Sequence, residues 1–343
     1  MLADWEVDPQ PILDISGTNQ SGHPVFGDPI GATRLSNGMI VVADRSESVI
    51  LLFDSSGTVI RSIGRKGSGP GEFEDMLWLR RCTLDSVFVM DRLLRLTVIS
   101  PNGAIVRQGA FPIPLHDDRL ACSKSGTFAA ITNVRGGDQV DVKTWTFSQA
   151  RGAVAVAQGG GPFRPVVDDI PVRVRRPLGQ TTTLAVSSDH LFVGTKDSAS
   201  VDRYTLGGQH VGRLPVDVAL RKTTAREYDL AVEAQLAFHE SSAVERREHK
   251  PLLARIPPPE FLPLYEELFV DALDSAWVVV SSLGDPATRL QPLFEGVSPR
   301  PVVTLPRAVR VFEIGADYIL GRYEDDEGEA HVVLYRMKRP TGR

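Results

Sequence analysis

The chain has 343 residues, of which 42% are hydrophobic and 24% are charged, with a formal net charge of −5. This mild acidity argues against nucleic acid as a partner, because phosphate binding needs a concentrated basic surface. No apolar run reaches the roughly 18 residues that a membrane span needs. Two cysteines exclude a disulfide-rich scaffold and a cysteine-based zinc site.

The chain begins MLADWEVDPQ, which lacks the basic and apolar regions of a secretory signal, so we expect no signal peptide in this sequence. A candidate strand follows, PILDISG (residues 11–17), and then the polar segment TNQSGHPVF. These two segments align with VIRSIGR and KGSGPGEF further along the chain. The alignment indicates that the N-terminal strand has the same place in the fold as the strand at 59–65.

Two longer segments repeat each other. Residues 27–60, GDPIGATRLSNGMIVVADRSESVILLFDSSGTVI, match residues 74–106, EDMLWLRRCTLDSVFVMDRLLRLTVISPNGAIV. Each predicts a strand, a tight turn, a second strand ending in Asp-Arg, a third strand, another turn and a fourth strand. Four short strands in a period of roughly 40–50 residues are typical of a β-propeller blade.

The glycine-rich stretch GRKGSGPGEF (64–73) joins these two repeats. A phosphate-binding P-loop needs lysine directly after its last glycine and a helix behind it, but here Lys66 precedes Gly67 and a strand follows. The glycine spacing of a dinucleotide site is also missing. We therefore interpret the stretch as the connector between two blades, in which Gly69 or Gly71 is expected to adopt a positive φ.

Weaker copies of the repeat follow along the chain, at 119–163, 182–216 and 268–306, and the last copy, 308–340, supplies only three strands. The N-terminal strand is the candidate for its missing outer strand, and closing the ring in this way removes exposed sheet edges. The sequence thus predicts an all-β fold, a six-bladed β-propeller closed by the N-terminal strand. The whole chain, 1–343, is expected to form one domain.

Two segments do not fit the blade pattern. Residues 163–181 are rich in Pro and Arg and form an insertion between the third and fourth blades. Residues 217–263 lie between the fourth and fifth blades, and their middle, 224–250, has the Ala, Glu, Leu and Arg content of one or two helices. Both insertions are expected on the connector side of the ring, where they would wall or cover the channel mouth. The alternative is a helix packed on the outside.

These residues carry a resemblance to known propellers. GRKGSGPGEF, followed by a strand pair ending in VMDR, resembles the NHL-repeat class of six-bladed propellers. PPPEFLPLYEELFVDALDSAWVV and VFEIGADYILGRYEDDEGEAHVVLYRMKR are similar to a bacterial group described only as 6-bladed β-propellers. The resemblance covers nearly the whole chain and implies the fold. It defines no activity, because propellers host many functions. Members of the group are commonly exported, which by analogy favours an exported or periplasmic location.

Charged residues recur on the connector side of the predicted ring. The Asp-Arg pairs end the second strands of the first two blades, and the connector adds further charges. We expect a ligand-binding site at the channel mouth formed by Asp44, Arg45, Arg65, Lys66, Glu72, Asp91, Arg92, His116 and His239. The alternative interpretation is structural: each Asp caps a turn and each Arg pairs with the next blade.

Metal and nucleophile patterns are weak. The amidating lyases are related propellers that hold zinc through channel histidines, but no three histidines here occupy matching inner-strand positions. No metal site is therefore assigned, and no cofactor is expected. Calcium stays open as in gluconolactonase-type propellers, because oxygen ligands leave little spacing pattern; the acidic residues near the channel mouth are Asp28, Glu72, Asp117, Asp118, Asp197 and Asp285. No G-x-S-x-G sequence is present.

Cys82 and Cys122 precede the first turns of adjacent blades, at matching places on neighbouring inner strands. A disulfide needs Cα atoms within roughly 7 Å, which neighbouring inner strands only sometimes allow. We expect two buried free thiols.

Two classes of function remain open from the sequence. The first is a binding module that presents its channel mouth to a small molecule, a peptide or a partner protein. The second is a propeller enzyme, a hydrolase or lyase with or without calcium, acting on a small molecule beneath the 217–263 insertion. We favour binding, because no nucleophile or metal constellation is recognisable.

Overall fold

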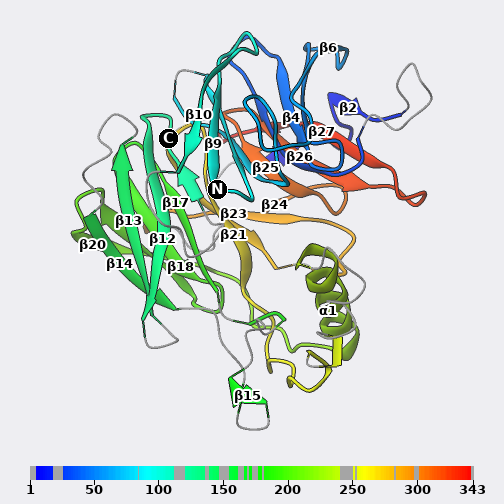
Figure 1. Ribbon diagram of the computed structural model, residues 1–343. Coiled ribbons are helices and arrows are strands. Elements are labelled where there is room, and N and C mark those ends of the chain that lie inside the picture. The colour runs from blue at the N-terminus through cyan, green and yellow to red at the C-terminus, as the bar shows by residue number, and fades with distance from the viewer. Residues whose placement is uncertain are drawn as a thin grey trace.

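The segment after Phe26 forms four antiparallel strands in the order that its sequence predicts. Burial falls from the first strand to the last: β3 (Pro29–Arg34) is almost wholly buried, whereas β6 (Val59–Ile63) is mostly exposed. The first strand of the sheet therefore lies inside the molecule and the fourth lies at its surface. The computed structural model (Figure 1) describes residues 5–17, 26–83, 85–111, 120–135, 139–146, 154–160, 166–167, 170–171, 177–179, 181–239, 250–251, 253–281, 283–296 and 301–340.

Six such sheets form the blades of the ring. Blades 1 to 3 consist of β3 with β4 (Ile40–Asp44), β5 (Val49–Phe53) and β6; β7 (Met76–Arg81), β8 (Val87–Asp91), β9 (Arg95–Ile99) and β10 (Ile105–Ala110); and β11 (Leu120–Cys122), β12 (Thr127–Arg135), β13 (Gln139–Thr146) and β14 (Val154–Gly160).

Blades 4 to 6 follow in the same way. They consist of β17 (Thr182–Val186), β18 (His190–Thr195), β19 (Ser200–Thr205) and β20 (His210–Pro215); β21 (Tyr265–Val270), β22 (Ala276–Val280), β23 (Arg289–Pro292) and β24 (Val303–Thr304); and β25 (Arg310–Ile314), β26 (Tyr318–Glu324) and β27 (Ala330–Lys338). A small hairpin of β15 (Val166–Val167) and β16 (Ile170–Pro171) lies outside the blades.

The N-terminal segment completes blade 6, as the sequence predicts. Both β1 (Glu6–Val7) and β2 (Leu13–Ile15) pair antiparallel with β27, so the first strands of the chain take the outer position of the last blade. Trp5 packs edge-on against Trp277 of blade 5, with ring centroids 4.8 Å apart. In Figure 1 the blue strands of blade 1 and the red strands of blade 6 lie side by side.

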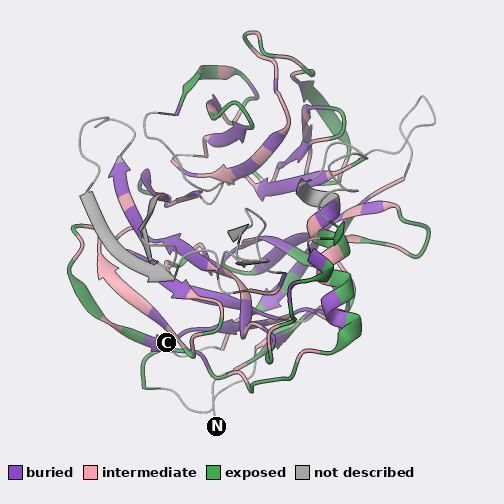
Figure 2. Ribbon diagram, turned by 60° about the horizontal axis from the view of Figure 1, so that its bottom comes forward, coloured by how far each residue is buried: buried purple, intermediate pink, exposed green. Residues whose placement is uncertain are grey.

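A hydrophobic cluster fills each of the six interfaces between neighbouring blades, including the closing interface of blades 6 and 1. At that closing interface Phe26 and Phe53 of blade 1 pack in the same cluster as Leu320 and Leu334 of blade 6. Figure 2 shows buried residues on the strands near the middle of the ring and exposed residues at its margin. The ring is therefore stabilised by blade-to-blade contacts all the way round.

The 217–263 insertion contains the helix that its composition predicts, α1 (Ala225–His239). Thr224 caps its start: the Glu227 N–H donates to Thr224 Oγ1 at 3.3 Å, and the Thr224 N–H donates to Glu227 Oε2 at 2.9 Å. The helix buries Tyr228 and Leu236, and its other side is exposed (Figure 2). No helix among the described residues is long and apolar enough to cross a membrane.

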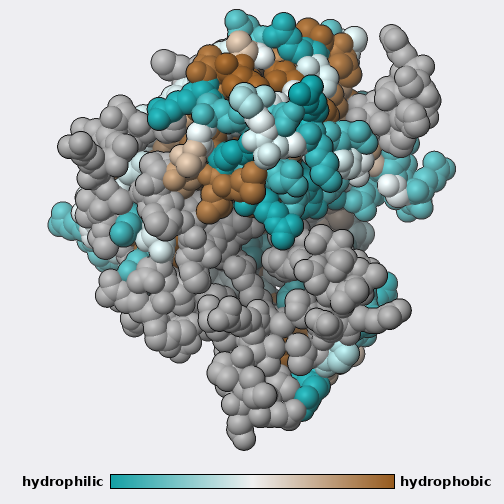
Figure 3. Space-filling model, in the orientation of Figure 1, coloured by the Kyte–Doolittle hydropathy of each residue, from teal (hydrophilic) through white to brown (hydrophobic). Residues whose placement is uncertain are grey.

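The outer strand of blade 1 exposes apolar side chains. Val59 is 49% exposed and Ile60 is 55% exposed on β6. Hydrophobic surface gathers at the upper edge of the molecule in Figure 3, where β6 lies in Figure 1. Outer strands are the least covered part of a blade, so isolated apolar residues there need no partner to explain them.

The glycine-rich connector is held by an arginine of the next blade. The Arg95 guanidinium donates to the carbonyls of Ser68 at 2.6 Å, Gly67 at 3.2 Å and Glu72 at 3.1 Å, and it forms an ion pair with Asp91. A phosphate-binding loop points its N–H groups inward, whereas this connector points carbonyls at a cation. This arrangement supports the interpretation as a blade connector.

The expectation that Gly69 or Gly71 adopts a positive φ is confirmed, because Gly71 has a φ of 73°. The Glu72 N–H donates to the Gly69 carbonyl at 3.1 Å, so Pro70 and Gly71 are the central residues of a turn, and the second central residue of a type II turn has a positive φ. Gly64 also has a positive φ, 90°, and a Cβ there would lie 2.4 Å from the Phe73 ring.

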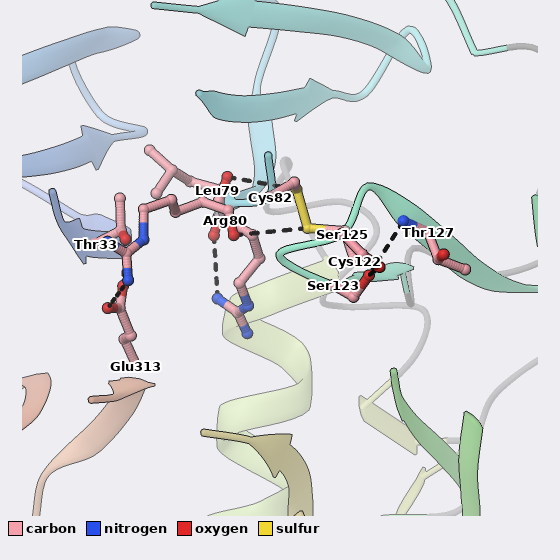
Figure 4. The surroundings of a disulfide bond; sticks show 10 residues. Thr33, Leu79, Arg80, Cys82, Cys122, Ser123, Ser125, Thr127 and Glu313 are labelled. Atoms are coloured by element: carbon pink, nitrogen blue, oxygen red, sulfur yellow. Dashed lines mark hydrogen bonds and ion pairs between the residues drawn. A yellow bond between two sulfur atoms is a disulfide. The ribbon is translucent and has the colours of Figure 1, made fainter. Parts of the chain in front are cut away.

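The expectation of free thiols is wrong. Cys82 and Cys122 form a disulfide with Cα atoms 5.6 Å apart, and the described residues include no free cysteine. The inner strands β7 and β11 converge towards the channel, and this brings the two residues within bonding distance. The disulfide joins blade 2 to blade 3 at the end of their inner strands (Figure 4).

We expect closure to depend on β2. Deletion of residues 1–17 exposes the outer edge of β27 and should cause aggregation or a large loss of stability. At single positions, Ile15→Ala should lower the free energy of unfolding by about 2–5 kcal/mol because Ile15 is 5% exposed, whereas Ile12→Ala at a 47% exposed site should change it by less than about 0.5 kcal/mol. Urea denaturation measures both. Equal values for the two variants, or a soluble truncation with unchanged Tm, would show that the ring closes elsewhere.

We expect the connector to tolerate a side chain at Gly69 better than at Gly71. Gly71→Ala forces an L-residue into a left-handed conformation and should lower the free energy of unfolding by about 1–2 kcal/mol. Gly69→Ala should cost less than about 1 kcal/mol, because only the mobile end of Glu72 must move. Chemical denaturation of the two variants measures their free energies of unfolding. A larger loss for Gly69→Ala than for Gly71→Ala would contradict the assignment of the left-handed conformation to Gly71.

Candidate functional site

The six inner strands surround a channel, and one cavity of about 300 Å³ lies where these strands begin. We call it the connector-side cavity, because the blade connectors enter the inner strands at this end. All six blades contribute to its wall through their inner strands, and two further residues come from rim turns. The charged residues of the wall are Arg45, Arg80, Lys196, Glu266, Glu267 and Arg310.

A second cavity, of about 380 Å³, lies at the opposite end, where the inner strands finish in tight turns. We call it the turn-side cavity. Its wall includes the Cys82–Cys122 disulfide and residues at the ends of inner strands, such as Val186 and Ile314. Five residues line both cavities: Arg80, Leu120, Leu184, Leu268 and Phe312. These five therefore lie at the middle of the channel.

Arg80 reaches across the channel. Its guanidinium donates a hydrogen bond of 3.1 Å to the Leu79 carbonyl and lies 5.6 Å from the centroid of the Phe269 ring. Figure 4 shows this side chain projecting away from its strand, beside the disulfide. Arg80 belongs to blade 2 and Phe269 to blade 5, which face each other in a ring of six. The positive charge therefore stands between the two cavities.

The Arg80 guanidinium has few partners for its five N–H donors. Among the described residues no carboxylate lies within 4.0 Å of it, and Leu79 supplies its one hydrogen bond. Burial lowers the pKa of the Arg80 guanidinium; the charge of Glu267 opposes this shift and that of Arg310 adds to it. The group carries its positive charge, since the arginine guanidinium is not deprotonated in proteins. It is a cation held in the channel without an ion-pair partner from the described chain.

Charges of both signs surround Arg80 in the connector-side cavity. Arg45, Lys196 and Arg310 add positive charge, and Glu266 and Glu267 add negative charge. In the part of the chain that the structure describes, Glu267 and Arg310 have no oppositely charged group within 4.0 Å. Cations thus outnumber carboxylates in this wall.

Arg45 is held at the cavity by an ion-pair cluster. Its guanidinium lies 2.5 Å from Asp28 Oδ2, and Arg322 of blade 6 lies 2.7 Å from Asp28 Oδ1. Burial alone would raise the pKa of the Asp28 carboxyl, but the hydrogen bonds and positive charges of Arg322 and Arg45 outweigh it and lower the pKa. The cluster joins blades 6 and 1 and fixes the position of Arg45.

Asp44 and Asp91, which we expected at the site, are buried turn caps. Asp44 accepts hydrogen bonds from the N–H groups of Gly27 at 2.7 Å and Ser46 at 3.0 Å. Asp91 accepts them from Leu93 at 3.1 Å and is paired with Arg95. Their oxygens already bind protein donors, so we leave both residues out of the proposed site. This supports the structural alternative for the two aspartates.

The expected connector residues lie on the connector side of the ring but outside the cavity wall. Arg65 is paired with Glu72 at 2.8 Å, and its side chain is 79% exposed. Lys66 is exposed and bridges through its backbone to Phe73. Arg92 lies 3.9 Å from Asp75 and is 63% exposed. None of these residues lines the connector-side cavity.

The side chains of the two expected histidines lie outside the part of the chain that the structure describes. His116 lies outside the described residues, and His239 is the last residue of α1, with a side chain that is not described. The insertion 163–181 also lies largely outside the described residues.

One group of side chains has the composition of a metal site. Asp325, Glu329 and His331 offer ligand atoms within 4.8 Å of one another. The same side chains also bind protein groups: His331 Nδ1 lies 2.7 Å from Asp14 Oδ1, and Glu329 accepts a hydrogen bond from the Gly17 N–H. The group therefore fastens the N-terminal segment to blade 6, and we assign it to ring closure. A calcium site elsewhere in the chain stays a prediction.

Apart from Arg80, which lines both cavities, the charged side chains of the turn-side wall are paired. Glu313 accepts hydrogen bonds from Thr33 Oγ1 and the Tyr318 hydroxyl, and it lies 3.3 Å from Arg81. Burial and the charge of Glu313 raise the pKa of Tyr318, so the hydroxyl stays protonated. Arg81 also lies 3.1 Å from Asp85. Because these groups satisfy one another, the turn-side cavity is a weaker candidate than the connector-side cavity.

The 217–263 insertion lies on the connector side. A Cβ on Gly284, in the loop between β22 and β23, would lie 3.7 Å from Leu230 of α1, and Arg221 lies 3.8 Å from Asp285 of the same loop. A third cavity of about 400 Å³ lies between the insertion and blade 4. Lys196 lines both this cavity and the connector-side cavity, so the insertion borders the channel mouth.

A family model described as 6-bladed beta-propeller matches residues 28–78, which form blade 1 and the start of blade 2. The chain is a six-bladed β-propeller. This propeller is similar over 98% of its length to 99% of a DUF4221-family member from Bacteroides vulgatus, with 11% identity and a TM-score of 0.57. It is also similar over 99% of its length to 97% of a Bacteroides fragilis protein, with 12% identity and a TM-score of 0.54.

A virginiamycin B lyase from Staphylococcus aureus matches 99% of the propeller with 90% of its own chain, at 11% identity and a TM-score of 0.42, which is too low to carry an argument. No curated protein matches the sequence significantly. At these identities the likeness to solved structures shows the fold alone.

Sequence analysis missed Arg80 because strand patterns assign charged residues to the solvent. The stretch MLWLRR nevertheless carried a signal. Two arginines that end the inner strand of a predicted blade must either face the channel or lie between blades. Successive side chains of β7 point to opposite faces, so Trp78 packs in the interface with blade 3 and Leu79 in the interface with blade 1. Arg80 follows them and extends into the channel.

We expect Arg80 to weaken the fold that contains it. Arg80 is half-buried, and replacing an unpaired, partly desolvated charge with an apolar side chain of similar length removes a desolvation penalty. Arg80→Met should therefore raise the free energy of unfolding by about 1 kcal/mol. The matched control is Arg95→Met, which breaks the pair with Asp91 and should lower it by about 3–5 kcal/mol. Calorimetry of both variants measures the effect, and a lower Tm for Arg80→Met would assign Arg80 a structural role.

Proposed function

We propose that this propeller binds an anionic ligand in the connector-side cavity, as a binding module and without chemistry of its own. The observation that carries the proposal is the Arg80 guanidinium, a channel cation without a carboxylate partner among the described residues. A charge in such a place destabilises the fold unless a partner arrives. Carboxylates and phosphates are the partners that the planar guanidinium fits best, because they accept two parallel hydrogen bonds.

The composition of the cavity supports this proposal. Arg80 and Arg310 carry positive charge without an oppositely charged group within 4.0 Å among the described residues, against one such carboxylate, Glu267. Mostly apolar side chains fill the rest of the wall, as in small-molecule sites that combine an apolar surface with a few polar groups. A volume of about 300 Å³ suits a small molecule or the end of a peptide.

The insertion supports the same side of the ring. Its cavity meets the connector-side cavity at Lys196 and is lined by Leu220, Phe261 and Leu262. Apolar residues next to a charged channel mouth would shield a bound ligand from water. Arg65, Lys66 and Arg92 stand on the same side, and their positive charges would attract an anion towards the opening.

No observation favours the enzyme alternative. The described residues that line the connector-side cavity include Glu266, Glu267 and Lys196, which could act as general bases, but no Ser, Cys or His that would form a nucleophile–histidine pair with them. Binding is therefore the function that we carry forward.

We expect a panel of small carboxylates and phosphates, screened by thermal shift, to contain compounds that raise Tm. A binder at 100 times its Kd adds about 2.7 kcal/mol to the free energy of unfolding. Arg80→Met should weaken binding of such a compound by at least about 30-fold, since truncating one partner of a buried charge pair costs about 2–5 kcal/mol. Titration calorimetry measures the Kd.

The matched control is Arg61→Met on β6, where the guanidinium is exposed and donates to the Asn102 carbonyl at 3.1 Å. It should leave the Kd unchanged. A panel without any binder, or equal loss in the two variants, would contradict the proposal.

A further inference from the structure

We infer that the ligand is a zwitterion, an α-amino acid or a free peptide end, with its carboxylate on Arg80 and its ammonium on Glu267. This inference rests on the proposed function, since it adds a second charge to the ligand of the same cavity. The observation behind it is that the cavity holds unpaired charges of both signs. Arg80 and Arg310 are the cations and Glu267 is the anion, and among the described residues none has an opposite charge within 4.0 Å.

These groups come from different blades and meet in the channel. Arg80 starts on β7 of blade 2 and reaches Phe269 on β21, two residues beyond Glu267 on the same strand. Glu267 and Arg310 both contribute to the electrostatic environment of Arg80. Arg80 and Glu267 thus face each other across the channel, close enough to influence one another and too far apart to form an ion pair.

The electrostatics favour a ligand with both charges over a simple anion. A simple anion on Arg80 would leave the carboxylate of Glu267 without a partner and close to another negative charge, and a simple cation on Glu267 would stand close to Arg80 and Arg310. Like charges at short range repel each other. A ligand that carries both charges pairs each group with an opposite one and leaves the cavity no more charged than before.

The remaining wall accommodates an apolar side chain. Leu120, Leu184 and Phe312 lie with Arg80 at the middle of the channel, where both cavities meet. The volume of about 300 Å³ is at the lower end for small-molecule sites, which suits one residue better than a long peptide. A hydrophobic amino acid such as leucine is the simplest probe of this arrangement.

The experiment is titration calorimetry with three probes of nearly equal shape: L-leucine, 4-methylpentanoate, which lacks the ammonium, and 3-methylbutylamine, which lacks the carboxylate. We expect L-leucine to bind at least about tenfold more tightly than either. If 4-methylpentanoate binds as tightly as L-leucine, the inference of a zwitterionic ligand is overturned, but the proposed anion site is not. Failure of L-leucine to bind would overturn the inference. Only failure of the wider carboxylate and phosphate panel as well would overturn the proposed function.

A variant separates the role of Glu267 from general effects. Glu267→Gln keeps the shape of the side chain and removes its charge. It should weaken the binding of L-leucine at least about tenfold and leave the binding of 4-methylpentanoate unchanged or tighter. Glu47→Gln, on an exposed turn of the connector side, is the matched control and should change neither Kd. Equal L-leucine affinity in the wild type and Glu267→Gln would contradict the assignment. The Tm of each variant without ligand shows whether the fold is intact.

Discussion

The pairing of β2 with β27 is the contact on which the rest of the molecule depends. Leu13 lies opposite Leu334 and Ile15 opposite Val332, so the outer position of blade 6 is filled by the start of the chain. Each blade packs on both neighbours, and an incomplete blade 6 would weaken its contacts with blade 5 and blade 1 together. His331, which is bound to Asp14, and Glu329, which is bound to Gly17, fasten the same junction from the side. A ring can position six inner strands around one axis only when it is closed.

That closed ring creates the conditions for the channel charges. Inner strands run side by side with one edge facing the axis, so a long side chain at a suitable position extends into a space bordered by every other blade. Arg80 is such a side chain, and a small shift of any blade would change its surroundings. The desolvated guanidinium opposes stability, whereas the six hydrophobic interfaces and the disulfide favour it. A rigid frame is therefore what allows an unpaired charge to stay in the channel.

Local patterns in the sequence were enough for the architecture. The Asp-Arg pairs, the tight turns and the glycines of the connector repeat because each blade needs the same turns, and the helix follows from its composition. What the sequence did not reveal depends on distances between segments. The Cys82–Cys122 bond follows from the convergence of two inner strands, and the connector carbonyls face Arg95 from the following strand. Arg80 stands out only when blade 2 and blade 5 are seen to face each other.

Of the residues that the sequence suggested for a site, Arg45 lies in the wall of the connector-side cavity. The aspartates were misleading for a physical reason: a carboxylate that ends a strand is equally suited to cap a turn and to bind a ligand. Their hydrogen bonds to Gly27 and Leu93 distinguish the two roles, and such contacts leave no trace in residue spacing. Glu267 and Arg310 were missed because inner strands of the later blades repeat less clearly.

The position of β2 has a consequence for biosynthesis. Residues 13–15 are translated before any complete blade exists, and their partner β27 is translated after all the strands of blades 1 to 5. Until β27 is made, the ring cannot close. The nascent protein thus passes through an open, horseshoe-like state in which the sides of blades 1 and 5 that later pack on blade 6 are uncovered. Any factor that keeps the early strands apart from other chains during translation acts on that state.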